Sequence, residues 1–84
     1  MKKTTILIVD DDTEICEAMS ETLIAKGFGV FSAQNGVTGL KILSEQHIDL
    51  VVLDLNMPRM DGYELVHKIA SSPETSAIPI VLMT

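Results

Sequence analysis

The chain has 84 residues, enough for one domain near the lower size limit of a single hydrophobic core. Apolar residues make up 46% of it and aromatic residues only 4%, so we expect an aliphatic core. The formal charge of −6 argues against a nucleic-acid surface, which needs clustered basic side chains. The single cysteine, Cys16, excludes an internal disulfide, and each apolar run is too short to cross a bilayer. The composition favours an acidic, soluble domain in the cytoplasm.

The first quarter of the chain predicts a strand followed by a helix. Residues 6–9 are an aliphatic run, typical of a strand buried on both faces, and the acidic triplet 10–12 ends it. Asp12 or Thr13 can cap a helix that stops near Gly27. Its expected core-facing residues recur at steps of four: Ile15, Met19 and Leu23.

The rest of the chain continues this alternation. It predicts, in order, a weak strand over 28–32, a short helix from 37 to about 47, a buried strand over 50–53, a helix opening at 61–62 and a strand over 78–83. Tyr63 is expected to be half-buried on the last helix. The order β-α-β-α-β-α-β calls for a parallel sheet with helices on both faces, which is an α/β fold.

Aspartates follow two of these strands. Asp10 and Asp11 come after the first, and Asp54 comes after the third. Because the carboxyl ends of parallel strands line one crevice, we expect the three carboxylates to lie together and to repel one another unless a cation intervenes. Mg²⁺ suits such a site, since it accepts one or two carboxylates, keeps waters and binds phosphate oxygens. An acidic triplet ahead of a helix can also serve only to cap it.

Two segments resemble the receiver domains of bacterial response regulators. They are residues 6–12, which read ILIVDDD, and residues 51–62, which read VVLDLNMPRMDG. The resemblance implies a flavodoxin-like (CheY-like) three-layer sandwich with strand order 2-1-3-4. It extends over residues 1–84, which would form a partial receiver domain that ends after the fourth strand.

The resemblance also assigns roles to individual residues. Asp54 would be the phosphoacceptor. Asp11 and Asp54 would bind Mg²⁺ through carboxylate oxygens, with Asp10 acting through a coordinated water. Asn56 would add its backbone carbonyl to the metal site, and Thr84 would be the switch hydroxyl that turns toward the phosphoryl group.

The chain departs from the family pattern after residue 84. Complete receivers continue with a fourth helix, a fifth strand that carries a lysine for the phosphoryl group, and a fifth helix. We expect the missing cation to slow phosphotransfer by about 10²–10³. We also expect residues 80–83 to form an exposed apolar edge strand, through which the chain would form a homo-oligomer.

Three functions compete at this point. The first is a phosphoacceptor module that receives its phosphoryl group from a histidine kinase or a phosphotransfer protein, and that is not an enzyme with a separate substrate. The second is a fragment that cannot be phosphorylated and acts as an interaction or oligomerisation module. The third, a phosphohydrolase with an aspartate nucleophile, is disfavoured because Asn56 stands where that class has its general acid.

Overall fold

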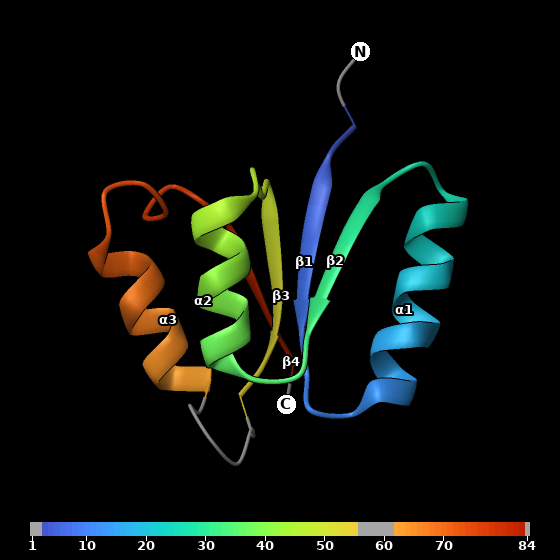
Figure 1. The fold of residues 1–84 in the computed structure, drawn as a ribbon, viewed down its shortest axis with the longest axis horizontal. Helices are drawn as coiled ribbons and strands as arrows, with labels where there is room; N and C mark the ends of the chain where they lie inside the picture. Colours follow the sequence, from blue (N-terminus) through green and yellow to red (C-terminus); the bar gives the residue numbers. More distant parts are fainter. Residues whose placement is uncertain (1–2, 56–61, 84) are drawn as a thin grey trace.

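The computed structural model describes residues 3–55 and 62–83, in which strands and helices alternate as the sequence predicts. The strands are β1 (Thr5–Val9), β2 (Gly29–Ala33), β3 (Leu50–Asp54) and β4 (Ile80–Met83), and the helices are α1 (Thr13–Ala25), α2 (Gly36–Glu45) and α3 (Gly62–Ser71). The strands pair in parallel in the order β2-β1-β3-β4, which confirms the predicted order. Figure 1 shows α1 on one face of the sheet and α2 and α3 on the other, so the predicted three layers are present.

The core lies on both faces of the two central strands. Alternate residues of β1 and β3 turn to opposite faces, as the pleat of a strand requires. The face under α2 and α3 buries one set, which includes Leu7, Val9, Val51 and Leu53, together with Leu65 and Ile69 of α3. The face under α1 buries a smaller set, made of Ile6, Ile8, Cys16 and Val52. Both central strands are therefore the near-continuous aliphatic runs that the sequence indicated.

Side chains at the helix ends explain where two of the helices begin. The carboxylate of Asp12 accepts hydrogen bonds from the backbone N–H groups of Glu14 and Ile15, at 3.0 and 3.3 Å, and so caps α1. Asn35 caps α2 in the same way, through a 2.9 Å bond from Thr38 N to its side-chain oxygen. Of the acidic triplet 10–12, only Asp12 thus caps the helix.

The buried stripe of α1 differs from the predicted one. Ile15 is 42% exposed, whereas its neighbour Cys16 is 2% exposed. Met19 and Leu23 pack beside Cys16 against the sheet, so the stripe runs at steps of three and four. The prediction was therefore right for Met19 and Leu23 and wrong for Ile15. Successive steps of four drift by about 40° around the helix, which places Ile15 on the side of the stripe away from Cys16.

Asp49 ties the amino ends of β1 and β3 together, at the opposite edge of the sheet from Asp10. Its backbone N–H donates to Thr5 O and its carboxylate accepts from Thr5 N, both at 2.8 Å. Its other carboxylate oxygen lies 2.8 Å from His47 Nε2. Asp49 therefore fixes both the start and the register of β1 against β3.

Several apolar and aromatic side chains lie at the surface. Val81 and Leu82 of β4 are 49% and 51% exposed, which agrees with the expected apolar edge strand. Tyr63 is 69% exposed, so the prediction of a half-buried ring was wrong. It stands two residues ahead of Leu65, which is fully buried, and two residues turn a helix by about 200°, to its far side.

Within the described residues, the helices are too short or too polar to cross a membrane.

Candidate metal and phosphoacceptor site

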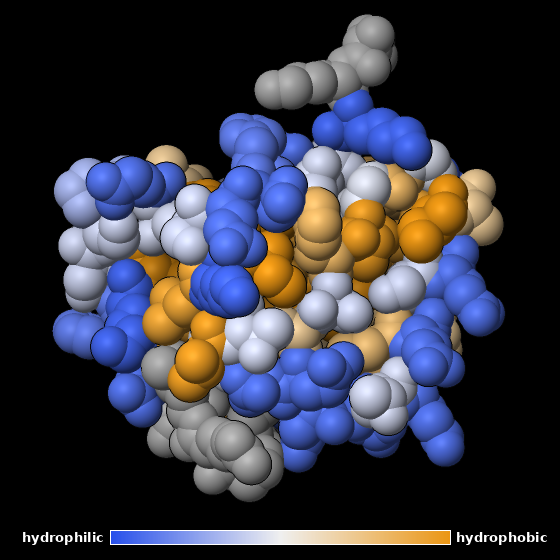
Figure 2. Space-filling model, viewed as in Figure 1, coloured by the Kyte–Doolittle hydropathy of each residue, from blue (hydrophilic) through white to orange (hydrophobic). Residues whose placement is uncertain are grey.

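Three carboxylates meet at the carboxyl edge of the sheet. β1 and β3 are neighbours with Val9 opposite Leu53, so the residues that follow them, Asp10 and Asp54, emerge side by side. One carboxylate oxygen from each of Asp10, Asp11 and Asp54 lies within 4.8 Å of the others. The structure thus brings together the three side chains that the sequence predicted to meet. In Figure 2, hydrophilic surface occupies this end of the molecule, below a band of apolar surface.

Asp10 is the fixed member of this cluster. It is 4% exposed, and its backbone N–H donates to Ala33 O at 3.0 Å. Its carboxylate accepts a 2.9 Å hydrogen bond from Asp12 N, and its carbonyl accepts one from the Cys16 thiol at 3.3 Å. Sequence reasoning missed this contact of Cys16, although a cysteine in the first turn after the Asp12 cap was a visible signal. Asp10 is therefore held by β2, by the β1–α1 turn and by α1 at once.

The three carboxylates differ in burial, and this sets their electrostatics. Asp11 is exposed and Asp54 is half-buried. Burial raises the pKa of Asp10 above its ordinary value, and the negative charges of Asp54 and Asp11 raise it further, although the hydrogen bond from Asp12 N opposes the shift. Holding the three carboxylates ionised at this site is therefore electrostatically unfavourable and lowers the stability of the fold.

The cluster fits a hard divalent cation. Mg²⁺ takes oxygen ligands at about 2.0–2.1 Å, so oxygens on opposite sides of the ion stand about 4.2 Å apart. Small side-chain adjustments bring oxygens that are 4.8 Å apart or less into that range. A cation would also offset the repulsion that raises the Asp10 pKa. Asp10, Asp11 and Asp54 are the residues that could hold it.

Gly62, the first residue of α3, packs against the backbone next to Asp54. Its backbone N–H donates to Leu55 O at 3.2 Å. A Cβ atom at Gly62 would lie 2.4 Å from Leu55 Cα and 2.8 Å from the carbonyl oxygen of Asp54. The first residue of α3 therefore sits directly on the backbone that carries Asp54, which only glycine allows.

Two predicted site residues, Asn56 and Thr84, lie outside the described residues, as does the whole of the loop 56–61. Leu55, the last described residue before that loop, is held by a 3.2 Å hydrogen bond from its N–H to Met83 O. The residues that lead to Asn56 and to Thr84 are thus paired with each other, at the end of β3 and β4.

Comparisons with known protein families give one family match. Residues 6–84 match the family model of the response regulator receiver domain. Among curated relatives, the protein named "Probable cyclic di-GMP phosphodiesterase" from Vibrio cholerae is 40% identical over 84 residues, and the transcriptional regulatory protein AfsQ1 from Streptomyces coelicolor is 39% identical over 79 residues. These matches cover 100% and 94% of this chain but only 19% and 34% of the two relatives, so the chain spans about a fifth to a third of their lengths.

Solved structures agree with this match. The chemotaxis protein CheY4 of Vibrio cholerae superimposes with a TM-score of 0.93 at 30% identity, over 96% of this chain and 68% of that one. The N-terminal domain of a response regulator receiver protein from Methanoculleus marisnigri gives a TM-score of 0.92 at 36% identity, over 95% of this chain and 65% of that one. The predicted fold class is therefore confirmed by close structural neighbours.

Replacing Gly62 by alanine is expected to destabilise the domain by roughly 1–3 kcal/mol, because the new Cβ meets backbone atoms of residues 54 and 55 that cannot move aside. Urea unfolding followed by circular dichroism measures the change. Gly39→Ala is the matched control in α2, since its Cβ would meet side-chain methyl groups of Val9 and Leu65 and no backbone atom, the nearest being a Val9 methyl group at 3.2 Å. Equal losses for the two variants would contradict the close backbone contact at Gly62.

Asp10→Asn is expected to stabilise the metal-free domain at pH 7, by on the order of 1 kcal/mol, because it removes a buried charge and keeps the acceptor for Asp12 N. The folded-state pKa of Asp10 is raised, so the wild type loses stability relative to the variant as the pH rises through that pKa. The difference should therefore shrink toward pH 4.

Urea unfolding at both pH values, with a chelator present, measures this difference. Glu45→Gln, at the exposed end of α2, controls for the loss of one negative charge. A variant less stable than the wild type at pH 7 would show that the buried charge is not the dominant cost.

Proposed function

The chain belongs to the response regulator receiver domain family of two-component signalling, and from this we propose that Asp54 accepts a phosphoryl group from a histidine kinase or a phosphotransfer protein in the cytoplasm. Mg²⁺, bound by Asp10, Asp11 and Asp54, would assist the transfer. The observation that carries the proposal is the approach of these three carboxylates to within 4.8 Å at the ends of β1 and β3.

Asp54 is the best placed of the three to be the nucleophile. Asp10 is nearly inaccessible and its carboxylate is engaged by Asp12 N, while Asp11 is exposed on the turn that leads into α1. Asp54 is half-buried at the end of β3, where its own pairing with Met83 of β4 and the pairing of the residue before it with β1 fix its backbone. A nucleophile on a rigid strand end is held in position for in-line attack.

The proposed step forms an acyl phosphate. A carboxylate oxygen of Asp54 forms a bond to phosphorus while the bond from phosphorus to the donor's leaving atom breaks, and the leaving atom takes the bonding electrons. When bound, Mg²⁺ supplies positive charge for the phosphoryl oxygens. Asp10 and Asp11 would hold that charge next to Asp54. The domain thus catalyses part of its own modification and acts on no separate substrate.

Asn56 and Thr84 keep the roles that the family resemblance gives them, as proposals. The Asn56 carbonyl would complete the metal site, and the Thr84 hydroxyl would donate to a phosphoryl oxygen on Asp54. The pairing of Leu55 N with Met83 O supports these roles, because it holds the chain leading to each residue beside the other.

We also propose that the chain self-associates through β4. Val81 and Leu82 turn to opposite faces of the sheet, and each leaves about half of its side chain in water. In the described residues β4 pairs only with β3. An open edge with apolar side chains favours pairing with another strand.

Incubation with Mg²⁺ and acetyl phosphate is expected to add the mass of one phosphoryl group to the wild-type protein, and none to Asp54→Asn, as read by intact mass spectrometry. Asp54 provides the only nucleophile in the proposal, so removing its charge abolishes the adduct. Chelation of the metal should reduce the adduct strongly.

Mg²⁺ at ten times its Kd should also stabilise the wild type by about 1.4 kcal/mol, an effect that Asp54→Asn should weaken.

An adduct of equal yield in Asp54→Asn would place the phosphoryl group elsewhere. A folded wild type that gains no adduct, yet is stabilised by Mg²⁺, would leave the metal site intact and refute phosphotransfer. In that case the domain would serve as a binding or assembly module.

Sedimentation velocity is expected to show a dimer or larger species of the wild type at tens of micromolar, which Val81→Lys converts to a monomer. A lysine on an edge strand opposes pairing between strands. Val37→Lys, on α2, is the matched control, since Val37 is an exposed valine (63%) away from β4. A monodisperse wild-type monomer would overturn the proposal.

A further inference from the structure

β2 is the second edge of the sheet, and its backbone geometry leaves hydrogen-bonding groups open to a partner. The amide of Gly29 and the carbonyl of Ala33 bond to the chain of β1 and its flanks. In a parallel pair, alternate residues turn both backbone groups to the same neighbour. The N–H and C=O groups of Val30 and Ser32 therefore face away from the sheet, where the described residues supply no strand.

The sequence of β2 does not protect this edge. Natural edge strands commonly carry a lysine, a proline or a bulge that prevents pairing with another chain. β2 reads GVFSA, without a charged residue or a proline, and its five residues pair with β1 in an unbroken register. The edge is thus regular and unblocked over its whole length.

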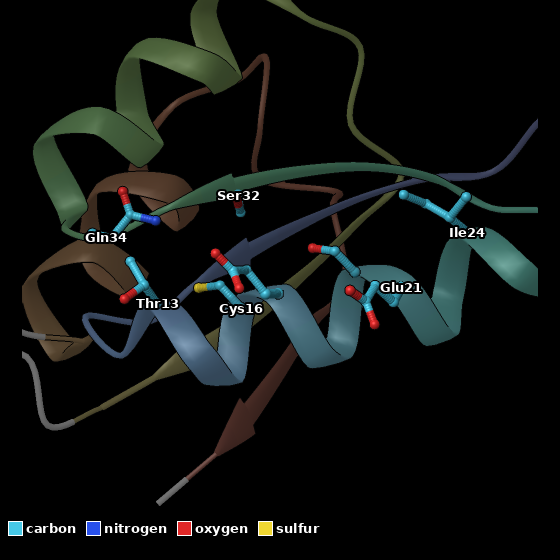
Figure 3. Close-up of a pocket in the computed structure, with 8 residues that line it drawn as sticks. Thr13, Cys16, Glu21, Ile24, Ser32 and Gln34 are labelled. Atoms are coloured by element: carbon cyan, nitrogen blue, oxygen red, sulfur yellow. The ribbon is translucent and has the colours of Figure 1, made fainter.

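A groove of about 360 Å³ runs beside this edge, between β2 and α1. Figure 3 shows its two walls, with Ser32 and Gln34 on the sheet side and Thr13, Cys16 and Glu21 on the helix. A side chain from a strand added beside β2, on the same face as Ser32, would point into this groove, because paired strands share their pleat.

The groove is acidic. Glu17 and Glu21 line it one helical turn apart, and the set of lining residues includes no lysine or arginine. Within the part of the chain that the structure describes, neither glutamate has an ion-pair partner. Two like charges four residues apart on a helix destabilise it, and a cation placed between them removes that cost.

We propose that β2 is a docking edge for an extended, basic segment of a partner protein. The segment adds to the sheet as a further strand, bonded to the outward groups of Val30 and Ser32, and places a lysine or arginine over Glu17 and Glu21. A second copy of this chain is a poor occupant. Two copies joined at β2 with their α1 helices on the same face would bring the like-charged pairs Glu17 and Glu21 toward each other. This surface is independent of the proposed phosphotransfer at Asp54.

The test uses the intact ¹⁵N-labelled domain and a capped peptide of alternating valine and lysine. Titration should shift the amide signals of Val30 and Ser32 and slow their hydrogen exchange, because these groups gain partners. The double variant Glu17→Gln/Glu21→Gln should raise the peptide Kd by about tenfold, from the loss of two exposed charge pairs. Glu14→Gln, an exposed carboxylate on α1 outside the groove, should leave the Kd unchanged.

A second peptide separates strand addition from simple charge attraction. It is made in two forms of the same sequence, one with N-methyl groups on the odd-numbered residues and one with them on the even-numbered residues. In one of the two forms the backbone nitrogens that face β2 carry methyl groups and cannot donate hydrogen bonds to it. Loss of binding in one form supports the proposal. Equal binding of all peptides, shifts confined to β4, or absence of binding at millimolar peptide would each overturn it.

Discussion

The parallel pairing of β1 with β3 is the constraint on which the rest of the structure depends. Their register places Asp10 beside Asp54, although more than forty residues separate the two in sequence. The same pairing buries the aliphatic side chains of both strands on both faces. Burial of apolar surface contributes about 25 cal/mol per Å², and it offsets the repulsion between carboxylates held at one edge. The hydrophobic core thus maintains a charge arrangement that would disperse in an unfolded chain.

The fold also places the three carboxylates in different environments. Asp10 is buried and fixed by hydrogen bonds, Asp11 is exposed, and Asp54 stands between these extremes at a strand end. A cation bound among them would be screened from water on the Asp10 side and open to water and phosphate on the Asp11 side. The site therefore has one protein-covered side and one side that faces solvent.

Much of the fold and of the site could be predicted because the signals were local or followed from strand order. The aliphatic runs identified β1 and β3, and parallel order then implied that Asp10 would meet Asp54. Side-chain exposure was harder to predict. Ile15 and Tyr63 have the composition of core residues, but their exposure depends on how far each helix is rotated about its axis, which tertiary packing sets. The contact of Cys16 with the Asp10 carbonyl depends on that same rotation.

The glycine at the start of α3 connects the backbone at the end of β3 directly to the first turn of that helix. Because Gly62 lies against the peptide between residues 54 and 55, a displacement of that peptide would require the first turn of the helix to move as well. This contact is made by backbone atoms on both sides, so it does not depend on the rotamer of any side chain. The backbone position at the end of β3 and the position of the first turn of α3 are therefore coupled, whichever side chains the surface of that helix carries.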